Sequence, residues 1–400
     1  MNFSDKNLLI LTNSYPDKED RHYGGIFVKE QVRYLAEHFN EAYVISPQPY
    51  GSNRNLRDYE YDNVRVYYPR FFHLPIEFFR KRLGDNFFKA SLQVIKREKL
   101  EFDLVHAHFT WPSGYAGALL KKELNMPLVI TAHGFDIYEV PFRSEYYRRK
   151  VLSALGAADH IITVSKSNVE ILTKKLEVSP GKVSLIPNGF DGDLFRPMAK
   201  EEARARLGLP SEKKITLTVG NLVPVKGHEY LIGAAEEVVK EKPNALFVIV
   251  GSGPLRKKLE NLVRFFNIES YFYFAGARPH EEIPLWMNAA DVFVLPSLIE
   301  GNPTVMFEAL GVGLPFVGTA VGGVPEIIIS DDYGLLCPPA DPEYLAEKIL
   351  IALEKEWERE KIRKYAERFK WESIANQILG VYTRYVFQRS FCDNLYVQKV

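Results

Sequence analysis

The sequence predicts an α/β protein with two domains, each built on a parallel sheet covered by helices. The chain has 400 residues, and a single hydrophobic core rarely serves more than about 250–300 residues. Short apolar runs rich in β-branched residues alternate with longer amphipathic stretches, which is typical of βαβ units. This alternation stops at one polar stretch, residues 190–213, and then begins again.

The apolar runs of the first half lack polar alternation, which indicates strands that are buried on both faces. They predict strands at residues 7–12, 42–47, 103–108, 127–134, 160–165 and 183–189. Helical patterns lie between several of them, at residues 26–39 and 113–125. Open α/β sheets bind ligands at the carboxyl ends of their strands, so we expect the site at that edge.

The polar stretch 190–213 contains one short helical pattern, and we interpret it as a linker. After it, strands are predicted at residues 215–221, 245–251, 271–276, 292–297, 315–320 and 334–339. Helices are predicted at residues 227–241, 254–266, 280–289, 303–311 and 341–355, and a last amphipathic helix at 371–387. These elements predict domains at residues 1–195 and 196–372, followed by a C-terminal helix and tail at 373–400.

The composition argues against several classes of protein. Lys+Arg and Asp+Glu both number 51, so we expect no nucleic-acid partner bound through global charge. The N-terminal sequence indicates a first core strand rather than a signal peptide, and no run of apolar residues is long enough for a membrane span. Cys337 and Cys392 form neither a metal-spaced pair nor a disulfide framework, which predicts a reducing, cytoplasmic location.

The stretch SLIEGNPTVMFEALG carries two glutamates, Glu300 and Glu308, on either side of a Gly-Asn-Pro turn. We expect Glu300 to precede a helix that begins near Pro303 and Glu308 to lie inside that helix. The N-terminal amides near Thr304 and Val305 would attract a phosphate, while the carboxylates could accept hydrogen bonds from sugar hydroxyls. This arrangement suits a nucleotide sugar. The alternative is an exposed loop glutamate and a helix-surface glutamate.

The same stretch resembles the E-x7-E signature of the retaining glycosyltransferases of family 4. Other segments are similar to that family in order and spacing: LTVGNLVPVKGHEYLI, IVGSGPLRKKLENL, FAGARPHEEIPLWMNAADVFVLPS and GTAVGGVPEII in the second half, and TAHGFDIY, ADHIITVSKSN and VSLIPNGFDGDLF in the first. The resemblance covers about residues 1–375. It implies the GT-B fold, in which two Rossmann-like domains face each other across a central cleft and the C-terminal helix crosses back to the first domain.

The resemblance also implies roles for individual residues. Glu308 would hold the ribose hydroxyls of the nucleotide, Glu300 would meet hydroxyls of the donor sugar, and Lys226 would neutralise the departing diphosphate. Gly322 and Gly323 would let backbone amides approach the phosphate or the sugar. The alternatives are a solvated lysine and an ordinary turn. The predicted nucleotide-sugar site comprises Gly24, Gly25, Asn221, Lys226, Glu300, Asn302, Pro303, Thr304, Val305, Glu308, Gly322 and Gly323.

His133 joins Lys226 and Glu300 as a predicted catalytic residue. It follows a strand at the expected ligand-binding edge, and in the family a histidine at this place lies beside the donor sugar. Asp136 follows on the same loop and is expected to orient ligand or backbone. His106 and His108 point to the same side of a neighbouring strand. Their spacing with His133 matches no metal signature, so no metal and no cofactor are expected.

Gly24 and Gly25 open the first long helix, and their loop is expected either to cradle the diphosphate or acceptor or to be a flexible connection. The chain departs from the family pattern at Asn221, where an arginine usually contacts the diphosphate. Asn221 carries no charge, so either Arg256 or Arg278 acts with Lys226, or stabilisation of the leaving group is weaker here.

Together these features predict a retaining hexosyltransferase. It would move a hexose or N-acetylhexosamine from a nucleotide-diphosphate sugar to a hydroxyl acceptor, in the synthesis of a glycan, a cell-surface polysaccharide or a glycolipid. The alternatives are another GT-B enzyme, a phosphorylase or an epimerase, and a non-catalytic nucleotide-sugar binding module. Residues 66–84 mix aromatic and basic side chains. They predict either a peripheral contact with the inner face of the membrane, suited to a lipid-linked acceptor, or a helix buried against the N-terminal core.

Overall fold

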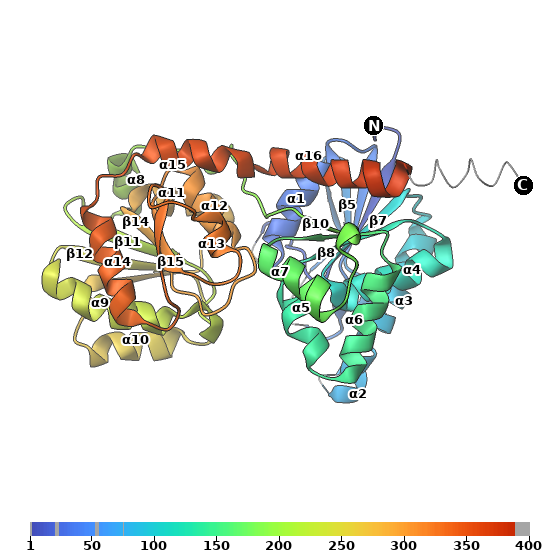
Figure 1. The fold of residues 1–400 in the computed structure, drawn as a ribbon, viewed down its shortest axis with the longest axis horizontal. Helices are drawn as coiled ribbons and strands as arrows, with labels where there is room; N and C mark the ends of the chain where they lie inside the picture. Colours follow the sequence, from blue (N-terminus) through green and yellow to red (C-terminus); the bar gives the residue numbers. More distant parts are fainter. Residues whose placement is uncertain (1, 21–23, 53–55, 75, 389–400) are drawn as a thin grey trace, which may run out of the picture. The chain divides into compact units, whose positions relative to one another are not determined.

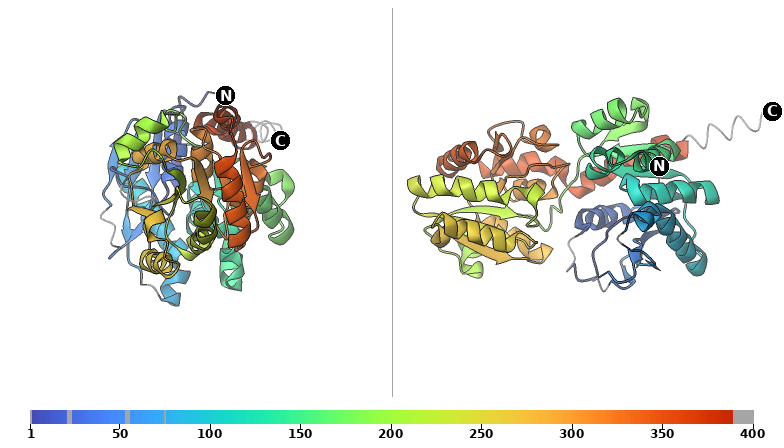
Figure 2. Two further views of the ribbon diagram at one scale, coloured as in Figure 1. Left: turned by 90° about the vertical axis from the view of Figure 1, so that its left-hand side faces the viewer. Right: turned by 90° about the horizontal axis from the view of Figure 1, so that it is seen from below.

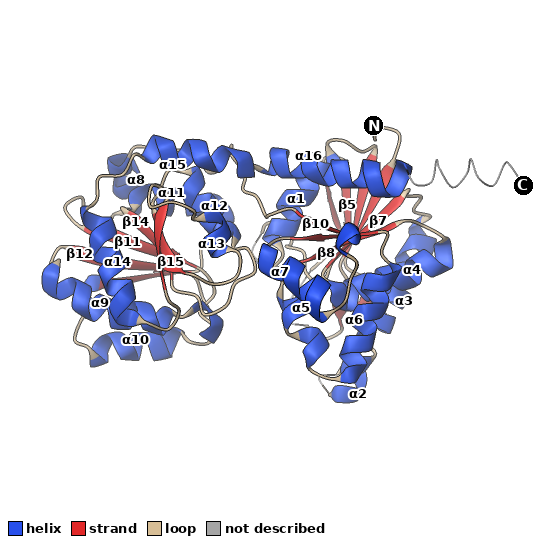
Figure 3. Ribbon diagram, in the orientation of Figure 1, coloured by secondary structure: helices blue, strands red, loops and turns tan. Residues whose placement is uncertain are grey.

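The computed structural model describes residues 2–20, 24–52, 56–74 and 76–388, and Figure 1 shows its ribbon. The chain divides into two compact units. Unit 1 contains the residues up to Pro187 and those from Trp371 onward, and unit 2 contains Asn188–Lys370. Each unit has its own sheet, wholly or mostly parallel, with helices on both faces, which confirms the predicted α/β class with two Rossmann-like domains (Figure 3).

The first boundary lies before the predicted position at residue 195. The Asn188 N–H donates to Asn302 Oδ1 at 2.8 Å, and the Phe190 N–H donates to the Phe369 carbonyl at 3.1 Å. These bonds join the start of the predicted linker to unit 2. The boundary between the two units therefore lies earlier in the chain than the change in sequence pattern suggests.

The sheet of unit 1 has eight strands in the order β10-β9-β8-β7-β1-β2-β5-β4. All neighbours run parallel except β4 and β5. After β1, the chain adds β2 on one side of it and later places β7 on its other side. The boundary between β1 and β7 is therefore a topological switch point. The strands are β1 (Asn7–Leu11), β2 (Glu41–Ile45), β4 (Tyr59–Tyr61), β5 (Val64–Tyr67), β7 (Leu104–His108), β8 (Leu128–Ala132), β9 (His160–Thr163) and β10 (Val183–Leu185), and β3 (Gln48–Pro49) pairs separately with β6 (Arg70–Phe71).

Helices bury both faces of this sheet. On one face, Leu8 and Ile10 pack in a cluster with α1 (Ile26–Ala36) and α16 (Trp371–Val381). On the other face, Leu9 and Leu11 share a cluster with the longer helices α3 (Leu83–Glu98), α4 (Tyr115–Leu124) and α6 (Glu145–Ala157). The C-terminal helix therefore returns to the first domain, as predicted. Short helices are α2 (Glu77–Lys81), α5 (Phe135–Tyr138) and α7 (Lys166–Glu170).

The sheet of unit 2 has six parallel strands in the order β13-β12-β11-β14-β15-β16. This is the Rossmann order, and its switch point lies between β11 and β14. The strands are β11 (Lys214–Val219), β12 (Ala245–Val250), β13 (Phe272–Gly276), β14 (Val292–Leu295), β15 (Phe316–Thr319) and β16 (Gly334–Cys337).

The helices of unit 2 cover both faces of its sheet, as the two further views show (Figure 2). One face carries α9 (His228–Glu241), α10 (Arg256–Phe265) and α14 (Pro342–Glu354). The other carries α11 (Ile283–Ala289), α12 (Thr304–Gly311), α13 (Val324–Ile327) and α15 (Arg359–Ala366). The short helix expected within the linker is α8 (Lys200–Leu207).

Each of the twelve predicted strands is present, although several end earlier than expected. Of the two alternatives for residues 66–84, the single helix buried against the N-terminal core is wrong. That stretch contains the end of β5, strand β6, helix α2 and the start of α3, because Pro69 interrupts it and Phe71 packs in its own small cluster. Helices α3 and α6 were not predicted. Residues 389–400 of the predicted tail lie outside the described residues. Within the described ranges, no helix is long and apolar enough to cross a membrane.

Candidate functional site

Three loops meet at the carboxyl edge of the unit 2 sheet, after β11, β14 and β15. The Leu298 N–H donates to the Val225 carbonyl at 2.8 Å, which joins the first two loops. The Gly323 N–H donates to the Gly301 carbonyl at 2.8 Å, which joins the second and third. Since β11 and β14 flank the switch point, this loop cluster lies where an open α/β sheet binds its ligand.

Glycine is required at two positions where these loops touch. Gly227 has φ +63°, and a Cβ there would lie 2.0 Å from the Pro296 carbonyl oxygen. Gly322 has φ +54°, and a Cβ there would lie 1.8 Å from the Glu300 carbonyl oxygen. Both distances are far below van der Waals contact, so the glycines allow the backbones to pack. The predicted amide contacts of Gly322 and Gly323 with a ligand stay predictions.

Lys226 and Glu300 form an ion pair within this cluster. Lys226 Nζ lies 2.6 Å from Glu300 Oε1, and the Ser297 hydroxyl donates to the same oxygen at 2.6 Å. The Glu300 side chain is only 8% exposed, while that of Lys226 is 24% exposed. A cation and a fixed carboxylate thus stand together at the switch point, which suits a ligand that carries both phosphate and hydroxyl groups. The sequence did not point to Ser297.

Glu308 lies in the second turn of α12, with its carboxylate almost buried. His280 Nε2 lies 3.1 Å from Glu308 Oε1, and the two side chains are 11% and 10% exposed. His280 begins a single 3-10 turn, His280–Glu282, that follows β13. Sequence reasoning missed this histidine, although its place just beyond the carboxyl end of a predicted strand was a usable signal.

The remaining predicted residues of this segment lie at the start of α12. Pro303 precedes the helix in an extended conformation, and Thr304 and Val305 begin it, half-buried. The Asn302 carbonyl accepts a 2.7 Å hydrogen bond from Asn188 Nδ2, in addition to the bond at Asn302 Oδ1. Asn302 therefore holds the segment after unit 1 against the start of α12, and its predicted contact with the ligand stays a prediction.

Asn221 is exposed at the start of the loop after β11. Of the two arginines considered as substitutes for its missing charge, Arg256 pairs with Glu260 at 2.6 Å. The Arg278 guanidinium lies 5.4 Å from the centroid of the Trp286 ring. Both arginines thus have neighbouring side-chain partners. Whether one of them acts with Lys226 on the diphosphate, or stabilisation of the leaving group is weaker here, stays a prediction.

In unit 1, three histidines lie in contact near the carboxyl ends of β7 and β8. His108 Nδ1 lies 3.0 Å from His133 Nε2, with the ring planes 13° apart. The His106 and His108 rings stack at 4.6 Å, and His106 bonds Tyr382 and Thr131 through its two nitrogens, at 2.6 and 2.7 Å. His106 therefore stacks on His108, while His108 and His133 meet edge to edge through their ring nitrogens. Within the part of the chain that the structure describes, no group of His, Cys, Asp and Glu side chains is arranged to hold a metal ion.

These histidines should make unit 1 sensitive to acid. Burial lowers the pKa of His106 and of His133 to about 3, and that of His108 well below its ordinary value. Below pH ~6.5 the unfolded chain takes up protons that the folded unit does not, so stability is lost as the pH falls from ~6.5 towards 3. Each such group contributes a slope of about 1.4 kcal/mol per pH unit in this window.

The measurement is the free energy of unfolding between pH 7 and 5. His106→Gln should flatten its pH dependence by about one proton, whereas His38→Gln, at an exposed position, should leave the dependence unchanged. An unaltered slope in His106→Gln would contradict the assignment.

Asp136 fixes the backbone that carries His133. Its Oδ1 accepts hydrogen bonds from the backbone N–H groups of His133 and Gly134 at 3.0 and 2.9 Å, and its Oδ2 accepts one from Thr110 at 2.7 Å. Asp136 is 2% exposed. Burial raises the pKa of its carboxyl above the ordinary value, although the amide donors favour the charged form. Asp136 therefore orients the loop, which was one of the two roles expected, and its contact with a ligand stays a prediction.

Gly25 precedes α1 at the same edge of the sheet. Its φ is +85°, and a Cβ there would lie 2.2 Å from the Ser14 carbonyl oxygen. The Ser14 hydroxyl donates to the Gly24 carbonyl at 2.8 Å. The Phe27 ring lies 4.9 Å from that of His133, so the start of α1 and the loop after β8 adjoin. Residues 21–23 of this loop lie outside the described residues.

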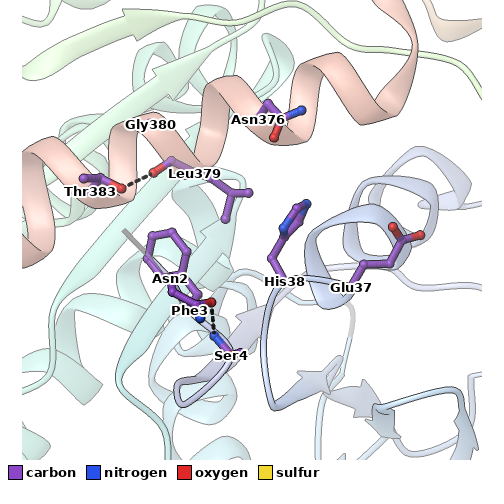
Figure 4. Close-up of a pocket in the computed structure, with 9 residues that line it drawn as sticks. All are labelled: Asn2, Phe3, Ser4, Glu37, His38, Asn376, Leu379, Gly380 and Thr383. Atoms are coloured by element: carbon purple, nitrogen blue, oxygen red, sulfur yellow. Dashed lines mark hydrogen bonds between the residues drawn. The ribbon is translucent and has the colours of Figure 1, made fainter.

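Unit 1 also has a pocket of about 360 Å³ that is remote from these residues (Figure 4). Its lining includes Phe3, His38 and Asn376. Phe3 precedes β1 and His38 follows α1, so the pocket lies at the amino edge of the sheet, opposite the edge that carries His133. We therefore do not assign it to the candidate site.

Known protein families match this chain over both of its units. The profile of the glycosyl transferases group 1 matches residues 199–369, and that of glycosyltransferase family 4 matches residues 24–194. The Bacillus subtilis (strain 168) glycosyltransferase TuaC, named for teichuronic acid biosynthesis, is 31% identical over 358 residues, covering 86% of this chain and 88% of its own. The D-inositol 3-phosphate glycosyltransferase of Corynebacterium efficiens is 29% identical over 312 residues, covering 73% of each chain.

Solved structures share the fold. Sucrose-phosphate synthase of Thermosynechococcus elongatus superimposes with a TM-score of 0.79 at 26% identity, covering 95% of this chain and 98% of its own. Anabaena HepE in complex with UDP-glucose gives 0.73 at 20% identity, covering 94% and 99%. The two profiles, the extent of the match to TuaC and the GT-B architecture of the structural neighbours lead to one conclusion: the chain belongs to the group 1, family 4 glycosyltransferases.

Proposed function

We propose that this glycosyltransferase moves a hexose or N-acetylhexosamine from a nucleotide-diphosphate sugar to a hydroxyl acceptor, with retention of configuration. The observation that carries the proposal is the loop cluster at the switch point of unit 2, where Lys226, Glu300 and Ser297 are in contact. The ammonium group of Lys226 suits a departing diphosphate, and the carboxylate of Glu300 suits sugar hydroxyls. Glu308, inside the next helix, suits the cis-diol of a ribose.

In this mechanism the protein positions the donor and stabilises charge. As the bond to the diphosphate breaks, positive charge develops on the sugar and negative charge on the leaving group. Lys226 stabilises the negative charge in place, without reorganisation. Glu300 accepts hydrogen bonds from the sugar, so it need not act as a nucleophile. The proposal places His133, a polar group of unit 1, beside the sugar. The loop that carries His133 is held by Asp136.

A thermal-shift screen over UDP-, GDP- and ADP-sugars tests the donor class. A ligand that binds the folded state raises the melting temperature by mass action, so the true donor should give the largest shift. NMR of the product then tests retention through the configuration of the new anomeric bond. Absence of any shift with all three donor classes would count against a nucleotide-sugar donor, and an inverted product would overturn retention.

The alternatives give different results in the same assays. A phosphorylase would turn over a sugar 1-phosphate without nucleotide, and an epimerase would change the sugar without transferring it. A binding module would show thermal shifts but no turnover. The names of the relatives, which concern teichuronic acid and inositol 3-phosphate, support a hydroxyl acceptor in polysaccharide or glycoconjugate synthesis.

We further propose that the enzyme acts in the cytoplasm and touches the inner face of the membrane through residues 72–82, which would suit a lipid-linked acceptor. Phe72, Leu74 and Ile76 are 61%, 42% and 54% exposed. The basic run Arg80-Lys81-Arg82 follows after Glu77, Phe78 and Phe79. Exposed apolar side chains beside cations are typical of surfaces that bind anionic lipid.

Vesicle sedimentation tests the membrane contact. Ile76→Asp should weaken binding to vesicles that contain phosphatidylglycerol several-fold or more, and vesicles of phosphatidylcholine alone should bind poorly. Phe265→Asp is the matched control, because Phe265 is 76% exposed in unit 2. Equal binding by Ile76→Asp and wild type would rule out this surface.

A further inference from the structure

We infer that His280 is a positioning residue for Glu308, and that through it the enzyme distinguishes ribonucleotides from 2′-deoxyribonucleotides. The inference rests on the proposed function, in which the Glu308 carboxylate accepts hydrogen bonds from the ribose hydroxyls. It adds a residue and a specificity to that subsite. The two side chains come from different elements, the turn after β13 and helix α12, and only the folded sheet brings them together.

The contact engages one oxygen of the carboxylate. His280 Nε2 lies 3.1 Å from Glu308 Oε1, within hydrogen-bond distance. A carboxylate accepts hydrogen bonds through both of its oxygens. An N–H on Oε1 therefore limits rotation of the group while Oε2 can still accept from a diol. Two hydroxyls on adjacent carbons need an acceptor of fixed orientation, so a rotating carboxylate would recognise them less well.

Burial makes this partner important. The Glu308 side chain is 10% exposed and that of His280 is 11% exposed. A carboxylate that is taken out of water without a hydrogen-bond donor is strongly destabilised, and it responds by turning away towards solvent. That movement would remove the acceptor that the ribose needs. His280 thus holds the Glu308 carboxylate in place before the nucleotide arrives.

The surroundings hold the histidine itself. The His280 ring packs on Phe195, with the ring centroids 5.3 Å apart. Phe195 is 1% exposed, and its N–H donates to the Asp191 carbonyl at 2.9 Å. The Glu282 N–H donates to the Pro279 carbonyl at 3.0 Å and closes the turn that begins at His280. The imidazole is therefore packed in place rather than mobile.

The test compares affinities for UDP, GDP and ADP with those for their 2′-deoxy counterparts, measured by calorimetry on the full chain. The nucleotide that binds most tightly is used, and the readout is the ratio of the two dissociation constants. A hydrogen bond to a charged group corresponds to about tenfold or more in affinity, so wild type should prefer the ribonucleotide by about that factor. The ratio is independent of the fraction of protein that is folded.

Glu308→Gln should abolish most of this preference, because the charge is lost. His280→Ala should lower the ratio to within about two- to threefold of unity, although it leaves Glu308 intact. His280→Gln should restore much of the preference, since its amide can donate to Glu308. His38→Ala, at an exposed position of unit 1, should behave as wild type.

The two hypotheses fail in different ways. If Glu308→Gln loses the ribose preference but His280→Ala retains it in full, Glu308 is the ribose ligand and the role of His280 is refuted. If Glu308→Gln also retains the wild-type preference, or if wild type shows none, the ribose subsite of the proposed function is wrong and the inference falls with it.

Discussion

Replacing Lys226 with alanine should lower turnover at saturating donor by about a hundred- to a thousandfold, while donor affinity should fall much less. Negative charge grows on the diphosphate as its bond to the sugar breaks, so the ammonium contributes more to the transition state than to the bound donor. Loss of the ion pair should also lower the stability of the folded protein. Without Lys226, the nearly buried Glu300 carboxylate keeps the Ser297 hydroxyl as a donor but loses its counter-charge.

Two further variants separate these effects. Lys226→Arg should recover turnover only in part, since a planar guanidinium does not replace a point charge. Glu300→Gln combined with Lys226→Ala removes both charges, so a loss of stability caused by the unpaired carboxylate should disappear while the loss of turnover remains. Lys240→Ala, on the exposed surface of α9, serves as the control. Wild-type turnover in both single variants of Lys226 would refute its role at the leaving group.

Replacing Gly322 with alanine should destabilise unit 2 and weaken donor binding at the same time. Two costs combine. A left-handed conformation costs a residue other than glycine about 1–2 kcal/mol, and overpacking typically adds about 1–3 kcal/mol. The new Cβ would meet the Glu300 carbonyl oxygen at 1.8 Å, so the loop that carries Glu300 must move. The free energy of unfolding and the affinity for the donor measure the two consequences.

Gly208 provides a control that isolates the steric term. It lies in the same unit with φ +65°, but nothing lies within 4 Å of a Cβ built there. Gly208→Ala should therefore show only the conformational cost and should leave donor affinity unchanged. If Gly322→Ala were no worse than Gly208→Ala in both measurements, the contact between the two loops would not matter for the site.

The sequence by itself determined the fold and the strand ends at which candidate residues lie. Continuous apolar runs can be stable only as strands covered on both faces, so their alternation with amphipathic stretches predicted two parallel sheets. The motif around Glu300 and Glu308 is contiguous, and Gly301 and Pro303 act locally on the backbone. For that reason the start of α12 could be placed without any knowledge of tertiary contacts.

Only the tertiary structure decided which side chains touch. Ser297 and Lys226 reach the same oxygen of Glu300 because β11 and β14 are neighbours in the sheet, although 74 positions separate Lys226 from Glu300. His280 and Glu308 are likewise distant in the sequence and meet only in the folded structure. Residue type and local periodicity carry no information about strand order, and strand order sets these pairs. At residues 66–84, Pro69 is a local signal against the single-helix alternative, but only tertiary packing placed Phe71 in a cluster with Phe87.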